Sequence, residues 1–296
     1  MSQAYSSLVT GARGWTVAAL CAVVAALLVS CGDSPPSQTR ATTTPTATSP
    51  APQPTPTSKP TPIDRPGQSH QTNLMPIVQH GPRDKPRIAL TFDADLTAAM
   101  RRRLTSGKVE SYYNDALFRH LRDLKVPATL FLTGLWMEQY PERTRELAAD
   151  PLFELGTHTY DHRAFTKHCY TLGTVPRPEM LSDVRRAVTI LDRLDPHATR
   201  WFRFPGGCYD GTALHELAPA GVTAVGLDVP GADGFAKSPK SIVDQVLQHA
   251  RNGSIVVLHM HGGDNAPFTD EAIPPIVKAL RAKGFELVTV TELMGH

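Results

Sequence analysis

The stretch IALTFDAD, residues 88–95, places two carboxylates directly after a short apolar run. A run of this length is consistent with a buried strand, so Asp93 and Asp95 stand where that strand ends. In barrels of alternating strands and helices, side chains at the carboxyl ends of the strands form the active site. Two such carboxylates on their own are more often part of a solvated loop, so the rest of the chain decides between these interpretations.

Short apolar runs alternate with amphipathic helical patterns from residue 86 to residue 296. The expected strands are Arg87–Phe92, Ala128–Thr133, Phe153–Thr157, Trp201–Phe204, Thr223–Leu227, Ser254–His259 and Glu286–Val290. The expected helices are Tyr112–Leu124, Met180–Leu194, Ser241–Arg251 and Asp270–Lys283. Strands that alternate with helices indicate βαβ units around a parallel sheet. The pattern favours an incomplete βα barrel over an open sheet, although it does not by itself close the barrel.

Polar groups follow several of the other expected strands. The sequence HTYDH, residues 158–162, sets two imidazoles four residues apart, a spacing that suits two ligands of one metal. The sequence lacks the glutamate of the His-Glu-x-x-His motif, which argues against a zincin-type peptidase. One aspartate and two histidines are a suitable ligand set for Zn²⁺ with an open position for water.

Each remaining group at a strand end has an ordinary alternative explanation. Arg203, before Pro-Gly-Gly, suits a surface turn, and Asp228 suits a strand-end cap. His259 and His261 suit core histidines with satisfied hydrogen bonds. The whole set at successive strand ends is better explained by an active site.

Residues 86–296 resemble the NodB-homology polysaccharide deacetylases, the carbohydrate esterases of family 4. The resemblance implies an α/β fold, namely a distorted (β/α)7 barrel. It also implies N-acetylated sugars of chitin, peptidoglycan and related polymers as substrates. Metal-dependent hydrolysis of the N-acetyl group of N-acetylhexosamine units would then release acetate.

The motifs of this family assign a role to each residue at a strand end. TFDAD, residues 91–95, resembles the first motif, in which Asp93 is the catalytic base and Asp95 a metal ligand. HTYDH resembles the second motif, whose His158 and His162 complete the metal triad. The resemblance implies Zn²⁺, while Co²⁺ or another divalent ion also suits two histidines and one carboxylate.

The later motifs supply the remaining catalytic groups. RFP, residues 203–205, resembles the third motif, whose Arg203 pairs with the catalytic base. Asp228 resembles the fourth-motif aspartate that orients the catalytic histidine. VLH, residues 257–259, resembles the fifth motif, which makes His259 the general acid; His261 is a second candidate that the pattern favours less.

Two departures from the family pattern concern the sugar-binding surface. Gly206 stands where the third motif usually has an aromatic residue. Its backbone N–H is still able to bind the oxyanion, but the aromatic wall is lost unless Tyr209 supplies it. Residues 228–235 contain no tryptophan, although the fourth motif usually has one near its aspartate.

The N-terminal part of the sequence is typical of a secretory signal peptide followed by a linker. The apolar run of residues 15–29 follows Arg13 and is short for a membrane span, which needs about 20 residues. It ends in LVSC, which resembles a bacterial lipobox, so we expect residues 1–30 to be a signal peptide and Cys31 to be lipidated. The alternative is an uncleaved signal anchor with an incidental cysteine. Either interpretation places the remaining chain outside the cytoplasm and attached to the cell membrane.

Residues 31–85 are expected to be a disordered linker rich in Pro, Thr and Ser, followed by the catalytic domain, residues 86–296. Such a composition does not bury enough apolar surface to offset the entropy of ordering. A linker of this kind suits work in a cell wall, which favours peptidoglycan as the polymer.

Two of the four cysteines lie in the N-terminal segments and two in the expected catalytic domain. Cys21 would leave with the signal peptide and Cys31 would be acylated. Cys169 and Cys208 remain, each after an active-site motif, and we expect them to form a disulfide in an oxidising compartment. The alternative is a pair of free buried thiols.

The net charge and the motifs argue against two other functions. The chain has 30 basic residues against 28 acidic ones, which argues against nucleic acid as a partner. A glycosyltransferase using an Asp-x-Asp metal site would leave the two histidines unexplained. A catalytically weak polysaccharide-binding envelope lipoprotein and a deacylase acting on something other than a polymer remain as alternatives.

Overall fold

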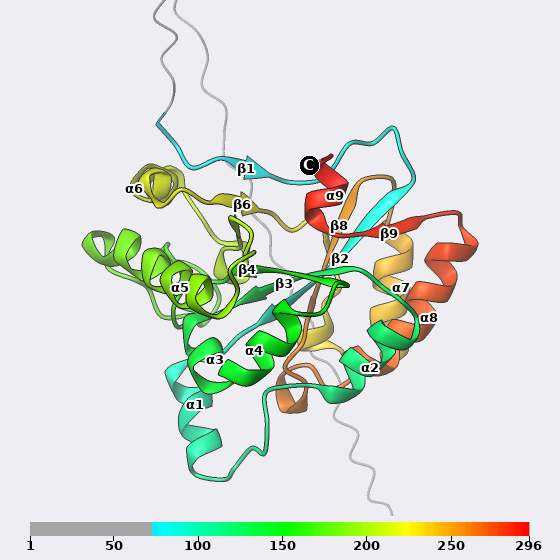
Figure 1. The fold of residues 1–296 in the computed structure, drawn as a ribbon, viewed down its shortest axis with the longest axis horizontal. Coiled ribbons are helices and arrows are strands. Elements are labelled where there is room, and N and C mark those ends of the chain that lie inside the picture. Colours follow the sequence, from blue (N-terminus) through cyan, green and yellow to red (C-terminus); the bar gives the residue numbers. More distant parts are fainter. Residues whose placement is uncertain (1–72, 296) are drawn as a thin grey trace, which may run out of the picture. The chain divides into compact units, whose positions relative to one another are not determined.

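The computed structural model describes residues 73–295, in which strands and helices alternate for most of the length (Figure 1). The strands are β1 (Ile77–Val78), β2 (Arg87–Ala94), β3 (Ala128–Leu132), β4 (Phe153–Thr157), β5 (Trp201–Phe202), β6 (Thr223–Val225), β7 (Val229–Pro230), β8 (Ser254–His259) and β9 (Glu286–Val288). The α-helices are α1 (Ala98–Thr105), α2 (Asp115–Asp123), α3 (Gly134–Gln139), α4 (Pro141–Ala148), α5 (Met180–Leu194), α6 (Gly211–Leu217), α7 (Pro239–His249), α8 (Thr269–Ala282) and α9 (Val290–Met294).

All strand pairs are parallel, in the order β1-β6-β5-β4-β3-β2-β8-β7. β8 runs along β2 from Ile88 to Asp93. β9 pairs with the first residues of β2, and β3 pairs with the last. Because the strands are parallel, their carboxyl ends lie along one edge of the curled sheet.

The alternation of side chains along β2 explains why it carries the site. Ile88, Leu90 and Phe92 point into the main core cluster with the surrounding helices. Ala89 points to the opposite face and packs in a separate cluster with residues of β3, β6 and β8. Successive strand residues point to opposite faces, so Thr91 and Asp93 share the face of Ala89.

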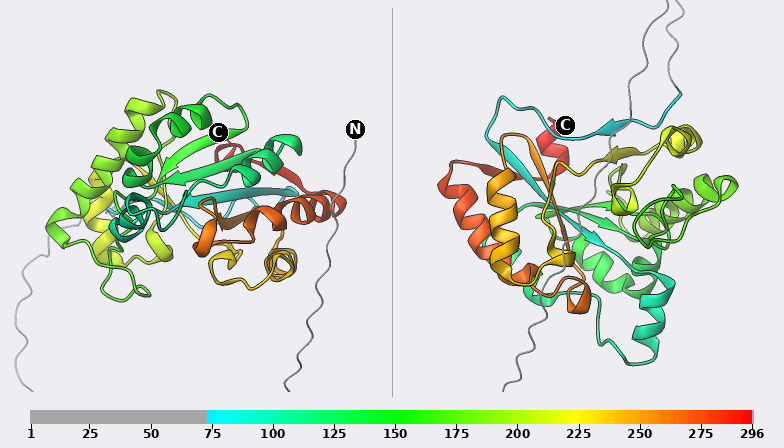
Figure 2. Two further views of the ribbon diagram at one scale, coloured as in Figure 1. Left: turned by 90° about the horizontal axis from the view of Figure 1, so that it is seen from below. Right: turned by 180° about the vertical axis from the view of Figure 1, so that it is seen from behind.

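Helices cover the sheet in two groups. α7 and α8 pack against each other, α2 packs on α8, and α8 also contacts β9. α3 and α4 lie with α5 near β4, on a different flank in both views of Figure 2. α5 has the bounds expected from its helical spacing, and it buries Val184, Ala187 and Leu191.

The ordered domain begins before residue 86, which corrects the expected boundary with the linker. Ile77 and Val78 pair with β6 at Ala224 and Val225, and Met75 is buried. Two apolar residues give no periodicity from which a strand could be predicted. The proposed signal peptide, Cys31 and the linker up to residue 72 lie outside the described residues. Between residues 73 and 295, no helix is both long and apolar enough to cross a membrane.

Candidate active site

The carboxyl ends of β2, β4, β5 and β8 bring most of the predicted site residues together. The residues that meet there are Asp93, Asp95, His158, His162, Arg203 and His259. The strand register accounts for this, since Asp93 is level with His259 and Leu132 is level with Thr157, which directly precedes His158.

Arg203 and Asp93 form a buried ion pair. Nη1 of Arg203 donates to Oδ1 of Asp93 at 2.7 Å and to Oγ1 of Thr91 at 2.8 Å. The guanidinium also lies 4.0 Å from the ring centroid of Phe131. Arg203 is fully buried, and burial lowers the pKa of its guanidinium while Asp93 raises it. The pair fixes the Asp93 carboxylate, whose Oδ2 faces His158 at 3.8 Å.

Asp95, His158 and His162 form a group that could hold a metal ion. Oδ1 of Asp95 lies 3.4 Å from Nε2 of His158 and 3.3 Å from Nε2 of His162. It is buried and has no hydrogen-bond partner in residues 73–295. Nδ1 of His158 is 2.8 Å from the carbonyl oxygen of Arg203, so Nδ1 carries the proton and Nε2 is free to act as a ligand. The donor set therefore fits a divalent cation.

The pKa shifts of these three residues agree with a site for a divalent cation. Burial lowers the pKa of His162 to about 4, which keeps its imidazole neutral and able to ligate. Burial raises the pKa of Asp95, but the nearby histidines outweigh it and hold the pKa well below its usual value. Burial lowers the pKa of His158, yet Asp93 and Asp95 outweigh that effect and raise it. The carboxylates of Asp93 and Asp95 thus favour a positive charge beside His158, as a bound divalent cation would supply.

The loop that presents the two histidines has a constrained backbone. Thr159 and His162 have positive φ values of 65° and 63°. The His162 amide donates to Oγ1 of Thr159 at 3.0 Å, and the Tyr160 amide donates to Oδ1 of Asp183 at 2.9 Å. The carbonyl of Thr159 accepts from Gly134 at the start of α3. These contacts hold both rings towards Asp95.

Asp233, and not Asp228, is the carboxylate that orients His259. Nδ1 of His259 is 2.8 Å from Oδ1 of Asp233, and the backbone amide of His259 donates to Oδ2 at 2.7 Å. Thr269 also donates to Oδ2, at 2.6 Å. Burial lowers the pKa of His259, but the charge of Asp233 outweighs it and raises the pKa to about 10. His259 therefore carries a proton at neutral pH.

The prediction for Asp228 is wrong because of the strand to which it belongs. It does not end β6; it directly precedes β7, which pairs with β8 from Val229 onward. This places Asp228 towards the amino ends of the strands, where Oδ1 accepts from Nη2 of Arg83 at 2.7 Å. Asp233 follows β7 and lies at the same edge as His259.

Gly206 and the cysteines lie together beside the third motif. Cys169 and Cys208 form the expected disulfide. A Cβ at Gly206 would stand 2.9 Å from Sγ of Cys169 and 3.0 Å from the ring of Tyr170. The disulfide and Tyr170 thus occupy the space that a side chain at residue 206 would need. Tyr209 packs instead on Phe204, with ring centroids 5.1 Å apart, and its hydroxyl accepts from Gln79.

Comparisons with known proteins agree with the fold. Residues 80–225 match the model of a family described as polysaccharide deacetylase. A peptidoglycan-N-acetylglucosamine deacetylase of Bacillus cereus is 26% identical over 215 residues, which are 72% of this chain and 70% of that protein. A chitooligosaccharide deacetylase of Bradyrhizobium sp. is 29% identical over 190 residues, which are 60% of this chain and 81% of that protein. The crystal structure of the Bc1960 peptidoglycan N-acetylglucosamine deacetylase is similar with a TM-score of 0.63 and 25% identity, covering 74% of this chain and 92% of that one.

These matches indicate the class of protein to which the chain is similar. Residues 80–225 are similar to polysaccharide deacetylases, and the named deacetylases among the similar proteins support a hydrolase that acts on amide bonds. Its curled sheet is the distorted (β/α)7 barrel of the family 4 carbohydrate esterases, as the sequence predicts. The family match ends at residue 225, so it is the structure that joins Asp233 and His259 to the site.

Proposed function

We propose that the protein removes the acetyl group from N-acetylhexosamine units of a cell-envelope polysaccharide such as peptidoglycan. The observation that supports this most is the arrangement around Asp95. The Asp93–Arg203 ion pair approaches the group at His158, and the His259–Asp233 pair approaches it at Asp95, each at 3.8 Å. A base and an acid next to one centre suit hydrolysis of an amide.

Asp95, His158 and His162 would hold a divalent cation, with Zn²⁺ as the first ion to test. When bound, such an ion polarises an acyl oxygen and lowers the pKa of bound water towards about 7. Asp95 and His162 are set up to receive it in their unprotonated forms.

Asp93 accepts the proton of the attacking water, and its position is fixed by Arg203. The water oxygen bonds to the acetyl carbon and forms a tetrahedral oxyanion. The backbone N–H of Gly206 is our candidate donor to that oxyanion, because preorganised donors stabilise the charge that develops there.

His259 gives its proton to the amide nitrogen, the C–N bond breaks, and acetate and the free amine leave. The side chain of His259 is 28% exposed, whereas that of His158 is 1% exposed, so His259 lies on the side open to a polymer. Asp233 holds Nδ1 and so directs Nε2 of His259 towards the centre.

We further propose that Cys31 anchors the protein to the cell membrane, outside the cytoplasm. This rests on the apolar run of residues 15–29 and the LVSC sequence that ends it. Peptidoglycan is the favoured polymer because the linker would reach into the wall, and because two of the similar proteins are named for that substrate.

The test is acetate release by the full-length protein, purified in detergent and supplied with Zn²⁺. N-acetylglucosamine oligomers and purified peptidoglycan are compared side by side, with Asp95→Ala as the control. Release that disappears in the control would support a metal-dependent deacetylase. No release with metal bound would favour another acylated substrate, and no release without metal binding would favour a polysaccharide-binding lipoprotein.

A further inference from the structure

We propose that Asp95, His259 and His261 form a second divalent-cation site that shares Asp95 with the first. An ion bound there would take Nε2 of His259 and stop deacetylation at excess metal. The binding part of this proposal stands on geometry alone, and the inhibition rests on the function proposed above.

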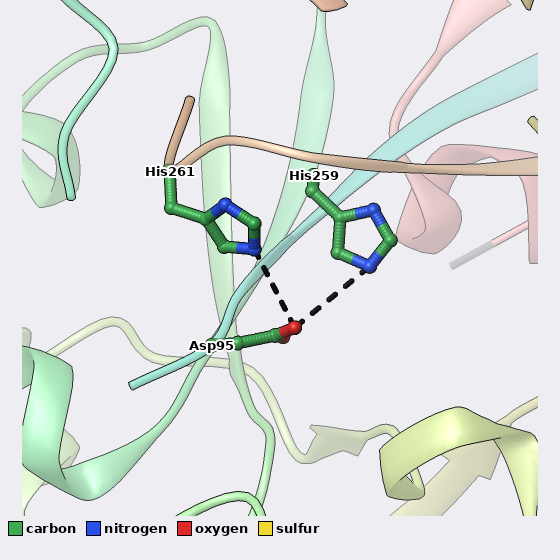
Figure 3. A group of neighbouring side chains, drawn as sticks. All are labelled: Asp95, His259 and His261. Atoms are coloured by element: carbon green, nitrogen blue, oxygen red, sulfur yellow. Dashed lines mark ion pairs between the residues drawn. The ribbon is translucent and has the colours of Figure 1, made fainter. Parts of the chain in front are cut away.

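The two carboxylate oxygens of Asp95 face two different pairs of histidines. Oδ1 faces His158 and His162, whereas Oδ2 lies 3.4 Å from Nε2 of His261 and 3.8 Å from Nε2 of His259 (Figure 3). A tetrahedral ion bound about 2.1 Å from each of two ligands sets them roughly 3.4 Å apart. The second group approaches this spacing almost as well as the first, and a carboxylate is able to bridge two ions.

His261 is the observation that requires an explanation. Its side chain is 2% exposed, and neither ring nitrogen has a hydrogen-bond partner in the described part of the chain. Most buried polar atoms are hydrogen-bonded, so a buried imidazole that makes no hydrogen bond and has only a 3.4 Å ion-pair contact with Asp95 indicates a missing ligand or a functional role. Its Nε2 points at Oδ2 of Asp95, as Figure 3 shows, and a cation between them would satisfy it.

His259 is arranged as metal-ligating histidines commonly are. One ring nitrogen, Nδ1, is bound to the Asp233 carboxylate, and the other, Nε2, faces Asp95. A carboxylate behind a histidine fixes its tautomer and aims the free nitrogen at a metal. Because His259 and His261 leave the end of β8 two residues apart, the sheet places both rings on the same side of Asp95.

An ion and a proton cannot share Nε2 of His259. The second ion would therefore remove the proton that the departing amine needs. General-acid catalysis is typically worth about 10²–10⁴-fold, so we expect a loss of that order at saturation of the second site. Acetate release would rise as the first site fills and fall as the second fills.

The test uses the full-length protein in detergent with Zn²⁺ alone as the probe. Ions bound per chain are measured by equilibrium dialysis and elemental analysis over increasing free Zn²⁺. His261→Phe is the informative variant, because His261 makes no hydrogen bond that this change would break. His261→Ala is a second variant, in case the larger ring is not accommodated. His197→Phe is the matched control, since His197 is exposed and outside the cluster.

We expect two ions in the wild type and in His197→Phe, and one ion in the His261 variants. One ion in the wild type at every concentration would overturn the site, as would two ions in the His261 variants. Acetate release provides a separate readout, and its fall at high Zn²⁺ should be absent from the His261 variants. A fall that persists in them would overturn the inhibition. Two bound ions without acetate release at any concentration would support the site and reject the proposed function.

Discussion

Nδ1 of His259 donates a 2.8 Å hydrogen bond to Oδ1 of Asp233, a carboxylate that follows β7 and is fully buried. Burial raises the pKa of Asp233, but the charge of His259 outweighs it and lowers the pKa, so the carboxylate is ionised. The buried anion in turn raises the pKa of His259 to about 10, although burial of the imidazole opposes it. A histidine held in its charged form is suited to donate a proton.

Asp233→Asn should remove most of the charge that keeps His259 protonated. The pKa of His259 would fall, and His259 would then lose its proton at a lower pH. We expect acetate release at neutral pH to drop by about 10²-fold or more, with the alkaline limb of the pH–rate profile moving to lower pH. The measurement is kcat/KM as a function of pH.

Asp228→Asn is the matched control for that experiment. Asp228 binds Arg83 at 2.7 Å, away from His259, so its loss should leave the pH–rate profile unchanged. We expect only a loss of about 1 kcal/mol in the free energy of unfolding. A shifted profile in Asp228→Asn, with a normal one in Asp233→Asn, would restore the role that the sequence predicts for Asp228.

Asp93→Asn and Asp95→Ala should separate the catalytic base from the metal ligands. Asp93 is held by Arg203, whereas Oδ1 of Asp95 faces both His158 and His162. We expect Asp93→Asn to abolish turnover while it keeps the first-site ion, and Asp95→Ala to lose the ion. Metal content and acetate release are measured on the same samples. Near-normal activity of Asp93→Asn would refute its role as base.

Much of the fold and site could be predicted because parallel strands place their carboxyl ends at one edge. Asp93, His158 and His259 are found there because the apolar runs that precede them are buried strands, as expected. The error at Asp228 came from one strand. The run from Thr223 was predicted to continue to Leu227, but β6 ends at Val225 and pairs with β5.

The remaining differences concern contacts that no local pattern contains. β7 is two residues long and lies beside β8, at the other end of the strand order from β6. Because β7 is so short, no apolar pattern shows that Asp233, and not Asp228, follows the end of a strand. The space over Gly206 is filled from Cys169 and Tyr170, which are distant in sequence, and only the assembled fold shows this.

Gly206→Ala should destabilise the protein through two separate effects. Gly206 has a φ of 59°, and an added Cβ would stand 2.9 Å from the Sγ of Cys169, which the disulfide holds in place. We expect a loss of roughly 2–4 kcal/mol in the free energy of unfolding, combining backbone strain with overpacking. Denaturant unfolding measures it, and kcat/KM should fall as the 205–207 turn shifts.

Gly221→Ala isolates the backbone part of that loss. Gly221 also has a positive φ, of 71°, but nothing lies within 4 Å of the added Cβ. We expect a cost of only about 1 kcal/mol and unchanged activity. Equal losses for the two variants would mean that the disulfide and Tyr170 do not restrict residue 206.

Asp183 links the site to the pH dependence of stability. It lies on α5, where Oδ1 accepts from the amide of Tyr160 and Oδ2 is 3.7 Å from Arg163. Burial raises the pKa of Asp183 to about 6 from its ordinary value of 3.8. The folded protein therefore binds this proton more tightly than the unfolded chain does. The stabilisation that the bound proton gives to the folded state is therefore fully present below pH 3.8, and it is lost as the pH rises through about 6.

Asp183→Asn should remove this dependence, because an amide does not titrate and its oxygen is still able to accept from Tyr160. The two pKa values differ by about two pH units, which corresponds to about 3 kcal/mol. Relative to the wild type, the variant should gain up to about that amount between pH 4 and pH 6. Urea unfolding across this range is the measurement. Asp192→Asn, at an exposed carboxylate on the same helix, should follow the wild type. If the free energy of unfolding of Asp183→Asn falls with rising pH as steeply as that of the wild type, the proton is not held at Asp183.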